Sequence, residues 1–449
     1  MKNSLFKESS LKELAEFLVN YALKKGADEV EVTLTETSEF TVDVRWGNVE
    51  NLIEAKSRQV GLRVIKDKKT AFASSSDLAP ETLKRLASNA LERALFSNSD
   101  EFAGLPPPSK VEFDLEALRL YDPEIPRLET QQKIKIAEET EKIALSDKRI
   151  TNSHGSTFET REAKTILANS NGFLHGYKET LCSLSLALQA GETDKRVEDS
   201  WSSTKRHFKE LESPEEVAQK AVQRTVRQLN PRKIPTQRVP VVFEPTMTSW
   251  LLGFIFSCVS GVAIYQKASF LEGRLGERIA NPAITIFDDG LLPGKLGTRP
   301  FDSEGVPSQK TVIIEKGVLK NYLCNTYAAR KLNLRSTGNA EGPGVSPNNF
   351  YLQPGETPPQ EIIRSLEKGL ILIRCLGLGL NPLTGDISRG AFGLWVEKGE
   401  ILYPVSEITI SGNLGQILED IEIIGNDLEF RSIFSGPTIK VRELILAGY

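Results

Sequence analysis

Apolar residues recur at helical spacing near the start of the chain and then alternate with polar residues. Residues 11–22 carry the helical pattern. Alternating runs follow within residues 30–73, with a turn pattern at Gly47-Asn48, and they predict short strands. A second helix is predicted to begin at Pro80, because proline is favoured at the first helical position. Together these patterns predict an N-terminal α/β domain over residues 1–105.

The second unit shows the same two patterns after a linker with three consecutive prolines. A predicted helix is followed by strand patterns at residues 150–160 and 163–169 and by a hairpin pattern at Asn171-Gly172. A charged helix near residues 214–229 closes the unit. We therefore place a middle α+β domain at residues 111–232.

The pattern changes again after a second proline-containing linker. Residues 236–449 are rich in glycine and proline and carry short strand patterns, which favours a strand-rich C-terminal domain with a closed or sandwiched sheet. Residues 245–266 contain no charged side chain, so a membrane span is one interpretation. Polar residues and glycines interrupt this run, and its apolar part is shorter than the ~20 residues that a span needs. One buried helix is therefore predicted there, and the predicted fold class is α+β.

The charge balance and the cysteine spacing narrow the possible classes of protein. Lysine and arginine total 56, aspartate and glutamate total 60, and the formal charge is −4. This balance argues against a nucleic acid or an anionic membrane as the partner. The cysteines include no closely spaced pair, and no apolar signal segment precedes the first helix, so we expect a cytoplasmic protein with reduced thiols. These cysteines are Cys182, Cys258, Cys324 and Cys375.

Common catalytic motifs are absent from the sequence. There is no P-loop, no G-x-S-x-G elbow and no H-E-x-x-H zinc motif. His154, His175 and His207 are the only histidines, and none has a second ligand at helical spacing, so we interpret each as a structural or surface residue. What remains are polar, glycine-containing stretches in the C-terminal domain. Such stretches either bring the backbone close to a ligand or form turns capped by their own carboxylates.

These stretches belong to a longer series of motifs. In chain order the series is SGVAIYQKASFL (260–271), FDSEGVP (301–307), NTYAARKL (325–332), STGNA (336–340), TGDISRGAFGLWV (384–396) and ISGNL (410–414). Several motifs in this order resemble the TldD/PmbA family, whose members are called modulators of DNA gyrase and are assigned as zinc metallopeptidases. The resemblance is strongest over residues 236–449 and extends in layout over the first two units.

The family has two branches that differ in one helix. TldD-like members carry His-Glu, three further residues and a second His, which supply zinc ligands and a general base. PmbA/TldE-like members lack this motif. The matching helix of this chain places about Leu251, Leu252 and Phe256 at the three positions, and no histidine follows His207. Leucine and phenylalanine neither bind zinc nor transfer protons. The resemblance therefore implies a PmbA/TldE-like chain with no catalytic residue and no zinc of its own.

The resemblance also implies a function and partners. Family members of this branch work as cytoplasmic dimers in a TldD/TldE-type metallopeptidase system that processes unfolded peptides. The TldD-like partner would hold zinc, and this chain would shape a channel that binds an extended peptide by strand addition. The residues expected to contact peptide or partner are Tyr265, Lys267, Asp302, Glu304, Asn339, Asp386 and Arg389.

Three alternatives stay open from the sequence. The chain could be a homodimeric peptide- or protein-binding module without protease activity. It could be a metal-free hydrolase that uses Asp302, Glu304 or Asp386, since paired carboxylates can transfer protons. Asp386 and Arg389 could also form a structural ion pair rather than a contact site. A link to DNA gyrase finds no physical support in the charge of the chain.

Overall fold

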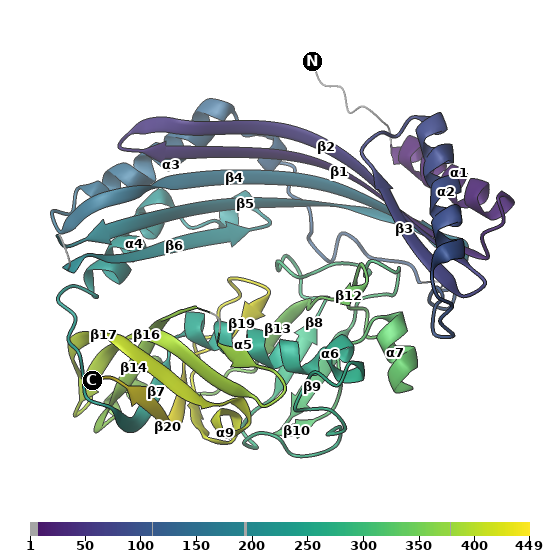
Figure 1. Cartoon of the computed structure of the whole chain (residues 1–449). Helices are drawn as coiled ribbons and strands as arrows, with labels where there is room; N and C mark the ends of the chain where they lie inside the picture. Colours follow the sequence, from purple (N-terminus) through teal and green to yellow (C-terminus); the bar gives the residue numbers. More distant parts are fainter. Residues whose placement is uncertain (1–7, 110, 193–194, 378) are drawn as a thin grey trace.

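The molecule consists of a long arched sheet that lies over a strand-rich C-terminal domain (Figure 1). The computed structural model describes residues 8–109, 111–192, 195–377 and 379–449. The N-terminal sheet is antiparallel and six-stranded. Its strands in spatial order are β3 (Lys69–Ser75), β2 (Asn48–Lys66), β1 (Glu29–Arg45), β4 (Ile150–Asn169), β5 (Leu174–Ala190) and β6 (Val197–Lys205).

The strands of this sheet are longer than the sequence pattern predicts. The alternating runs within residues 30–45 form one continuous strand, β1, and the two runs at 150–160 and 163–169 form one continuous strand, β4. The turn predicted at Gly47-Asn48 lies one residue earlier, at Trp46-Gly47, because Asn48 already pairs with Arg45. The turn at Asn171-Gly172 lies where it was predicted. Because β1 pairs with β4 along nearly its whole length, strands from the first two predicted domains share a single sheet.

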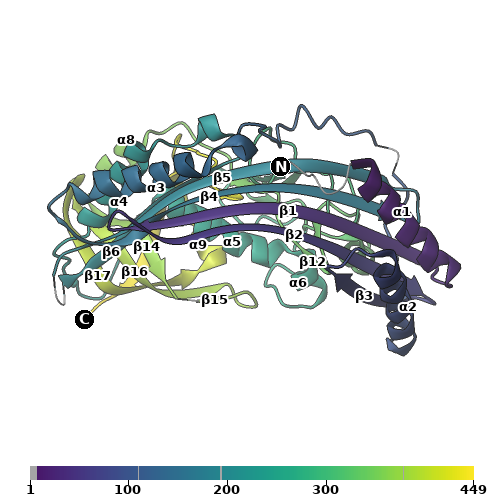
Figure 2. The same ribbon diagram turned by 90° about the horizontal axis from the view of Figure 1, so that it is seen from above.

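Helices cover this sheet at its two ends (Figure 2). On β1, the buried residues Val32 and Leu34 pack with one helix pair, whereas Phe40 and Val42 pack with the other. Since these four positions are an even number of residues apart, they point to the same face of the strand. The first pair of helices is α1 (Glu8–Lys24) and α2 (Pro80–Phe96), and the second is α3 (Thr130–Leu145) and α4 (Pro214–Val226).

The C-terminal domain is built around a closed five-stranded barrel. Its strands in order are β14 (Lys368–Leu376), β7 (Gln237–Phe243), β20 (Ile439–Ala447), β17 (Glu400–Asn413) and β16 (Asp386–Glu397). Pairing between β14 and β16 closes the barrel, and β15 (Leu380–Asn381) and β18 (Ile421–Ile424) extend it. The predicted α+β class and the closed sheet are confirmed.

A second, five-stranded sheet lies beside the barrel. Its order is β10 (Val318–Leu319), β9 (Lys310–Glu315), β8 (Ile286–Asp289), β13 (Asn349–Leu352) and β19 (Phe434–Ser435). A small hairpin and short helices complete the domain: β11 (Ala340–Glu341), β12 (Gly344–Val345), α7 (Thr326–Leu332), α8 (Pro359–Arg364) and α9 (Leu414–Glu419). The sequence pattern does not predict such short strands individually.

The uncharged run of the C-terminal domain forms two helices, α5 (Pro245–Val259) and α6 (Gly261–Tyr265). One side of α5 is buried in the core of the domain through Leu251, Leu252 and Ile255. The predicted buried helix is therefore confirmed. Among the described residues, no helix combines the length and the apolar character needed to cross a membrane.

Candidate functional site

The loop at residues 301–307 is held by one buried carboxylate. Asp302 accepts hydrogen bonds from the backbone N–H groups of Glu304, Val306 and Ala340, each at 2.9 Å. Gly305 has a φ of +80°, and a Cβ there would lie 3.1 Å from the ring of Phe173 in the β4–β5 turn of the N-terminal sheet. The loop therefore has a fixed shape and rests closely on that sheet.

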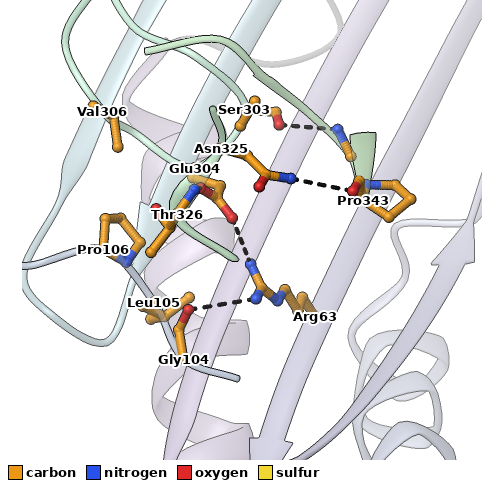
Figure 3. Close-up of polar contacts among 12 residues, drawn as sticks. Arg63, Gly104, Leu105, Pro106, Ser303, Glu304, Val306, Asn325, Thr326 and Pro343 are labelled. Atoms are coloured by element: carbon orange, nitrogen blue, oxygen red, sulfur yellow. Dashed lines mark hydrogen bonds and ion pairs between the residues drawn. The ribbon is translucent and has the colours of Figure 1, made fainter. Parts of the chain in front are cut away.

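An ion pair joins this loop to the N-terminal sheet (Figure 3). Arg63 of β2 donates to Glu304 with 3.1 Å between Nη1 and Oε1, and both side chains are buried. The second oxygen of Glu304 accepts from the backbone N–H of Thr326 at the start of α7, at 2.8 Å. Arg63 also donates to the carbonyl oxygen of Gly104 at 3.4 Å. One carboxylate therefore connects a sheet, a loop and a helix start.

The same junction contains more carboxyl groups than its arginine can neutralise. Glu31 lies directly opposite Arg63 in the β1–β2 pairing, and its Oε2 atom is buried without a hydrogen-bond partner. Burial raises the pKa of Glu31 to about 8, and the charges of Glu304 and Asp302 add to this effect. Burial, with the charge of Glu304, also raises the pKa of Asp302 to about 7. The junction therefore holds protons near neutral pH.

A pocket of about 460 Å³ opens beside this junction. Its lining includes Glu31 and Arg63, the exposed ring of Phe72, and Ser303 of the Asp302 loop. Since both halves of the molecule contribute to it, the pocket depends on the Arg63–Glu304 contact.

Asn339 belongs to a second buried network behind the loop. Its amide nitrogen donates to Asp288 at 2.7 Å and to the carbonyl oxygen of Ser346 at 3.0 Å. Asn348 donates to the same carboxylate through its backbone and its side chain. Burial raises the pKa of Asp288 to about 6, although these hydrogen bonds oppose the rise. Asn339 is fully buried, so it shapes the loop from within.

The remaining predicted contact residues lie nearer the surface, around α5 and α6. Tyr265 at the end of α6 packs edge-on against Tyr327, and Lys267 is exposed with a φ of +56°. The guanidinium of Arg389 on β16 lies 4.7 Å from the ring centre of Trp250 on α5. A guanidinium over an aromatic face is a favourable contact that leaves its other face available.

Asp386 and Arg389 do not pair with each other in the described part of the chain. The exposed carboxylate of Asp386 accepts from the Thr384 hydroxyl at 2.6 Å and from the Asn413 amide at 3.0 Å, and these bonds lower its pKa. Arg389 instead donates to the carbonyl oxygen of Leu376. The seven predicted residues thus fall into a buried group at the domain junction and a second group around α5 and α6. In this second group, called the exposed group, Lys267 and Asp386 are exposed and Tyr265 and Arg389 are half-buried.

The α5 helix does not offer a zinc site. Leu251 and Leu252 are 2% and 1% exposed and pack in the core, and Phe256 packs against Phe350 and Phe434. Burial raises the pKa of the nearby Cys258 thiol to about 12, so it is protonated, whereas zinc binds the thiolate. Among the described residues, no three His, Cys, Asp or Glu side chains are gathered to hold a metal ion.

The carboxylate that precedes α5 is also occupied. Glu244 accepts two hydrogen bonds from Arg227, at 2.6 and 2.8 Å, and lies 3.7 Å from Arg224. Two of the histidines make contacts outside α5. His207 bonds to the carbonyl oxygen of Arg119, and His175 packs against Phe113. The residues at and around α5 therefore do not fit the metal of a zinc peptidase.

Comparison with family models and curated proteins identifies the relatives of this chain. Residues 236–448 match the PmbA/TldA metallopeptidase C-terminal domain, residues 123–229 its central domain and residues 30–94 its domain 1. Metalloprotease PmbA of Escherichia coli O157:H7 is 35% identical over 423 residues, which cover 94% of this chain and 93% of that protein. The chain belongs to the PmbA/TldD family.

Other members of the PmbA/TldD family are similar over the whole length. A PmbA homologue of Haemophilus influenzae is 33% identical and covers 98% of this chain and 97% of its own. A crystal structure of a proposed modulator of DNA gyrase from Bacteroides thetaiotaomicron superposes with a TM-score of 0.92 at 28% identity, over 99% of this chain and all of that one. TldE from Thermococcus kodakarensis shares the fold, with a TM-score of 0.84 at 22% identity over 97% of this chain and all of its own.

The sequence analysis did not identify Glu31 and Arg63, the two residues of the N-terminal sheet that meet the Asp302–Glu304 loop. Both strands carry several other charged residues, and Glu31 stands at a polar position of the alternating pattern. The pattern therefore does not distinguish the buried Glu31 and Arg63 from the charged residues that face solvent. Nothing in the spacing reveals that Glu304, 241 positions after Arg63, is the partner.

Proposed function

We propose that this chain is the zinc-free subunit of a TldD/TldE-type metallopeptidase system that processes unfolded peptides. The proposal rests on α5, where the resemblance matches about Leu251, Leu252 and Phe256 to the zinc motif, and where Leu251 and Leu252 are core residues. A TldD-like partner would supply the metal and the catalytic base. This chain would contribute binding surface to the peptide channel.

The side of the sheet that faces the C-terminal domain supports a role in peptide binding. Glu31 on β1 reaches the C-terminal loop, so the residues an even number of positions away share that side. They include Thr33, Thr35, Thr37 and Thr41, all half-buried. Hydroxyl groups of this kind bond to peptide backbone without selecting a particular side chain. Such a surface suits extended peptides of varied sequence.

The exposed group around α5 supports the same role. Beside this group, the half-buried rings of Trp250 and Phe254 on α5 pack edge-on with ring centres 4.4 Å apart, and Arg389 lies against both rings. Aromatic rings and arginine supply much of the binding energy in protein interfaces. We therefore assign the contact with peptide or with the TldD-like partner to this group rather than to the buried Asp302 and Glu304.

The test is co-expression of this chain with a TldD-like chain from the same genome. We expect a complex with one zinc ion per pair and chelator-sensitive cleavage of an unfolded peptide. This chain alone should bind no zinc and cleave nothing. Stoichiometric zinc and chelator-sensitive cleavage by the isolated chain would contradict the proposal.

A variant tests the role of the exposed group in the complex. Arg389→Ala should raise the KM for peptide several-fold while kcat changes little, because the guanidinium is assigned to binding. Arg238→Ala is the matched control, since Arg238 forms an exposed ion pair with Glu443 on the barrel. Equal KM values for Arg389→Ala, Arg238→Ala and the unaltered complex would remove the assignment.

A homodimeric binding module without protease activity is the second candidate. It is favoured by the fact that Trp250, Phe254 and Arg389 are arranged in this chain without any partner. Peptide binding by the isolated chain, with no complex formed on co-expression, would support it over the first proposal.

A further inference from the structure

The pocket beside the domain junction has polar groups in its lining that bond to nothing else in the chain. Glu31 and Arg63 line this pocket and are each only 9% exposed. The Oε2 atom of Glu31 and the Nε–H group of Arg63 have no hydrogen-bond partner in the part of the chain that the structure describes. Buried polar groups without partners destabilise a fold. Two such groups in one pocket therefore favour a ligand that supplies the missing partners.

The charges of the lining favour an anion as this ligand. Arg63 is already paired with Glu304, and burial raises the pKa of Glu31 to about 8, so Glu31 is protonated at neutral pH. Arg93, in the last turn of α2, also lines the pocket, and its side chain forms neither an ion pair nor a hydrogen bond with any described residue. One positive charge is thus left uncompensated, and protonated Glu31 can donate to an anion instead of repelling it. Guanidinium groups bind carboxylates especially well.

An aromatic ring and two hydroxyl groups complete the lining. Phe72 and Ser74 lie two residues apart on β3 and therefore point to the same side, and Ser303 faces them from the C-terminal loop. Phe72 is 53% exposed, so an apolar side chain can cover its ring. β3 lies beside α2 at one end of the sheet (Figures 1 and 2). This lining matches a carboxylate that has an apolar side chain next to it, as at the C-terminus of a peptide.

A peptide held in the pocket can extend along β1. Thr33 lines the pocket, and Thr35 and Thr37 follow on the same side of the strand. We propose that the pocket binds a carboxylate of a peptide substrate, with Arg93 as the ion-pair partner and Phe72 against the neighbouring apolar side chain. This inference rests on the peptide-binding role proposed above and adds the class of peptide. The carboxylate can come from the C-terminus or from an acidic side chain, and the experiment separates these sources.

Fluorescence anisotropy with the isolated full chain tests the carboxylate. A short labelled peptide that ends in leucine should bind about tenfold more tightly with a free C-terminus than with an amidated one, because the amide has no negative charge. A third peptide has an amidated end and an aspartate before the leucine. If it binds as tightly as the free-ended peptide, acidic side chains are also ligands; if it binds as weakly as the amidated one, the terminus is the ligand. Equal Kd values for all three peptides, or no binding of the free-ended one, would overturn the proposal.

A variant assigns this carboxylate to the pocket. Arg93→Gln should raise the Kd of the tight-binding peptide about fivefold and leave that of the amidated leucine peptide within about twofold. Arg85→Gln is the matched control, since Arg85 is also exposed on α2 but does not line the pocket. Both positions are exposed, so the variants should fold. An equal loss of affinity in the two variants, or an equal loss for both peptides, would overturn the proposal.

A second variant tests the aromatic wall. The unaltered chain should prefer a free-ended peptide ending in leucine to one ending in glycine by about threefold, and Phe72→Ala should abolish this preference. Leu95→Ala is the control, because Leu95 is 56% exposed on α2 and lies outside the lining. A preference that persists in Phe72→Ala would remove the ring from the site.

Failure of this inference can be distinguished from failure of the proposed zinc-free role. Co-expression with a TldD-like chain and measurement of zinc test that role. The carboxylate pocket depends only on the comparison of free and amidated ends. Peptide bound equally well with either end would overturn the pocket and leave the peptide-binding role intact.

Discussion

Arg63, which the sequence analysis did not single out, joins the two halves of the molecule. It lies in β2, yet its partners are Glu304 in the C-terminal domain and the carbonyl oxygen of Gly104. Removing one member of a buried ion pair leaves the other charge without compensation, which costs more than the pair itself contributes. The junction is therefore sensitive to single substitutions.

Arg63→Leu is expected to lower the free energy of unfolding by about 3–5 kcal/mol, because it leaves Glu304 buried and unpaired. Chemical denaturation monitored by circular dichroism measures this. The double variant Arg63→Leu/Glu304→Gln should recover part of the loss, since no charge then remains unpaired. Arg149→Gln, which breaks an exposed ion pair with Asp147, should change stability little. An Arg63→Leu protein as stable as the Arg149→Gln control would contradict this account.

Glu31 makes stability depend on pH in a direction opposite to that of most acidic residues. Its folded pKa of about 8 lies above its ordinary value of 4.5, so the folded chain keeps a proton that the unfolded chain releases. Its contribution to stability is therefore complete below about pH 4.5 and is lost as the pH rises toward 8. The melting temperature should therefore fall as the pH is raised from about 6 to about 9.

Glu31→Gln should make this fall shallower, because the amide does not ionise, whereas Asp302, with its pKa raised to about 7, keeps part of the fall in place. Thermal melts of the variant and the unaltered chain at both ends of this pH range provide the measurement. Asp386→Asn is the control, since the exposed Asp386 carboxyl has a lowered pKa and is already ionised at both ends. A Glu31→Gln melting curve with the same pH dependence as the unaltered chain would show that Glu31 is not the titrating group.

At the scale of elements, α5 shows what the sequence pattern can and cannot reveal. The absence of charge from residues 245–259 correctly predicts a buried helix. The pattern does not reveal which side of the helix is exposed, because apolar residues occur all round it. Leu252 faces the core, while Trp250 and Phe254 lie against Arg389 on β16. That distinction depends on a strand more than 100 residues away.

Leu251 and Leu252, which the resemblance matches to the zinc motif, are buried, and this leads to a prediction about introducing the motif. The triple variant Leu251→His, Leu252→Glu and Phe256→His should be destabilised by several kcal/mol, since it places polar groups in a packed core. It should also bind no stoichiometric zinc, as measured by mass spectrometry under native conditions. Phe256→His alone, at the partly buried position, is the milder control. Stoichiometric zinc in a stable triple variant would contradict the assignment of these positions to the core.

The long strands show a second limit of sequence patterns. In β1 the alternation of apolar residues stops between Leu34 and Phe40, where Glu36 and Ser38 occupy the side that faces the helices elsewhere. This gap predicts two strands, because the local sequence contains no apolar face there. The structure continues the strand because β2 and β4 pair on both sides of it. Hydrogen bonding to distant segments therefore decides the length of the element.

At the scale of the whole molecule, arginines fasten the sheet to the C-terminal domain at two separated places. Arg206, after β6, donates to the carbonyl oxygens of Lys295, Leu296 and Thr298. Arg330 on α7 donates to the carbonyl oxygens of Phe102 and Leu105 at the other end. Each arginine side chain binds several backbone carbonyl oxygens across the junction, so these two side chains hold loops of one half against the other.

Arg206→Ala combined with Arg330→Ala should loosen the attachment while each half stays folded. Limited trypsin digestion is then expected to cut the linker at Arg232 or Lys233 several-fold faster, with circular dichroism unchanged. Arg238→Ala combined with Arg149→Ala removes two exposed arginines and serves as the control. Digestion of the linker at the same rate in both double variants would show that these contacts do not hold the two halves together.

The pairing of β1 with β4 also has a consequence for synthesis of the chain. Glu31 pairs with Asn169, and Val44 pairs with Ser156, so more than 100 residues leave the ribosome between one strand and its neighbour. Until β4 is synthesised, the edge of β1 that pairs with it has no neighbouring strand. Only the helix pair α1 and α2 is then available to cover the apolar side chains of the β1–β2 hairpin. A nascent chain halted near residue 109 would expose the whole β1 edge of that hairpin, while β3 covers only residues 60–66 of the β2 edge. The first part of this protein to be translated is thus among the last to reach its final fold.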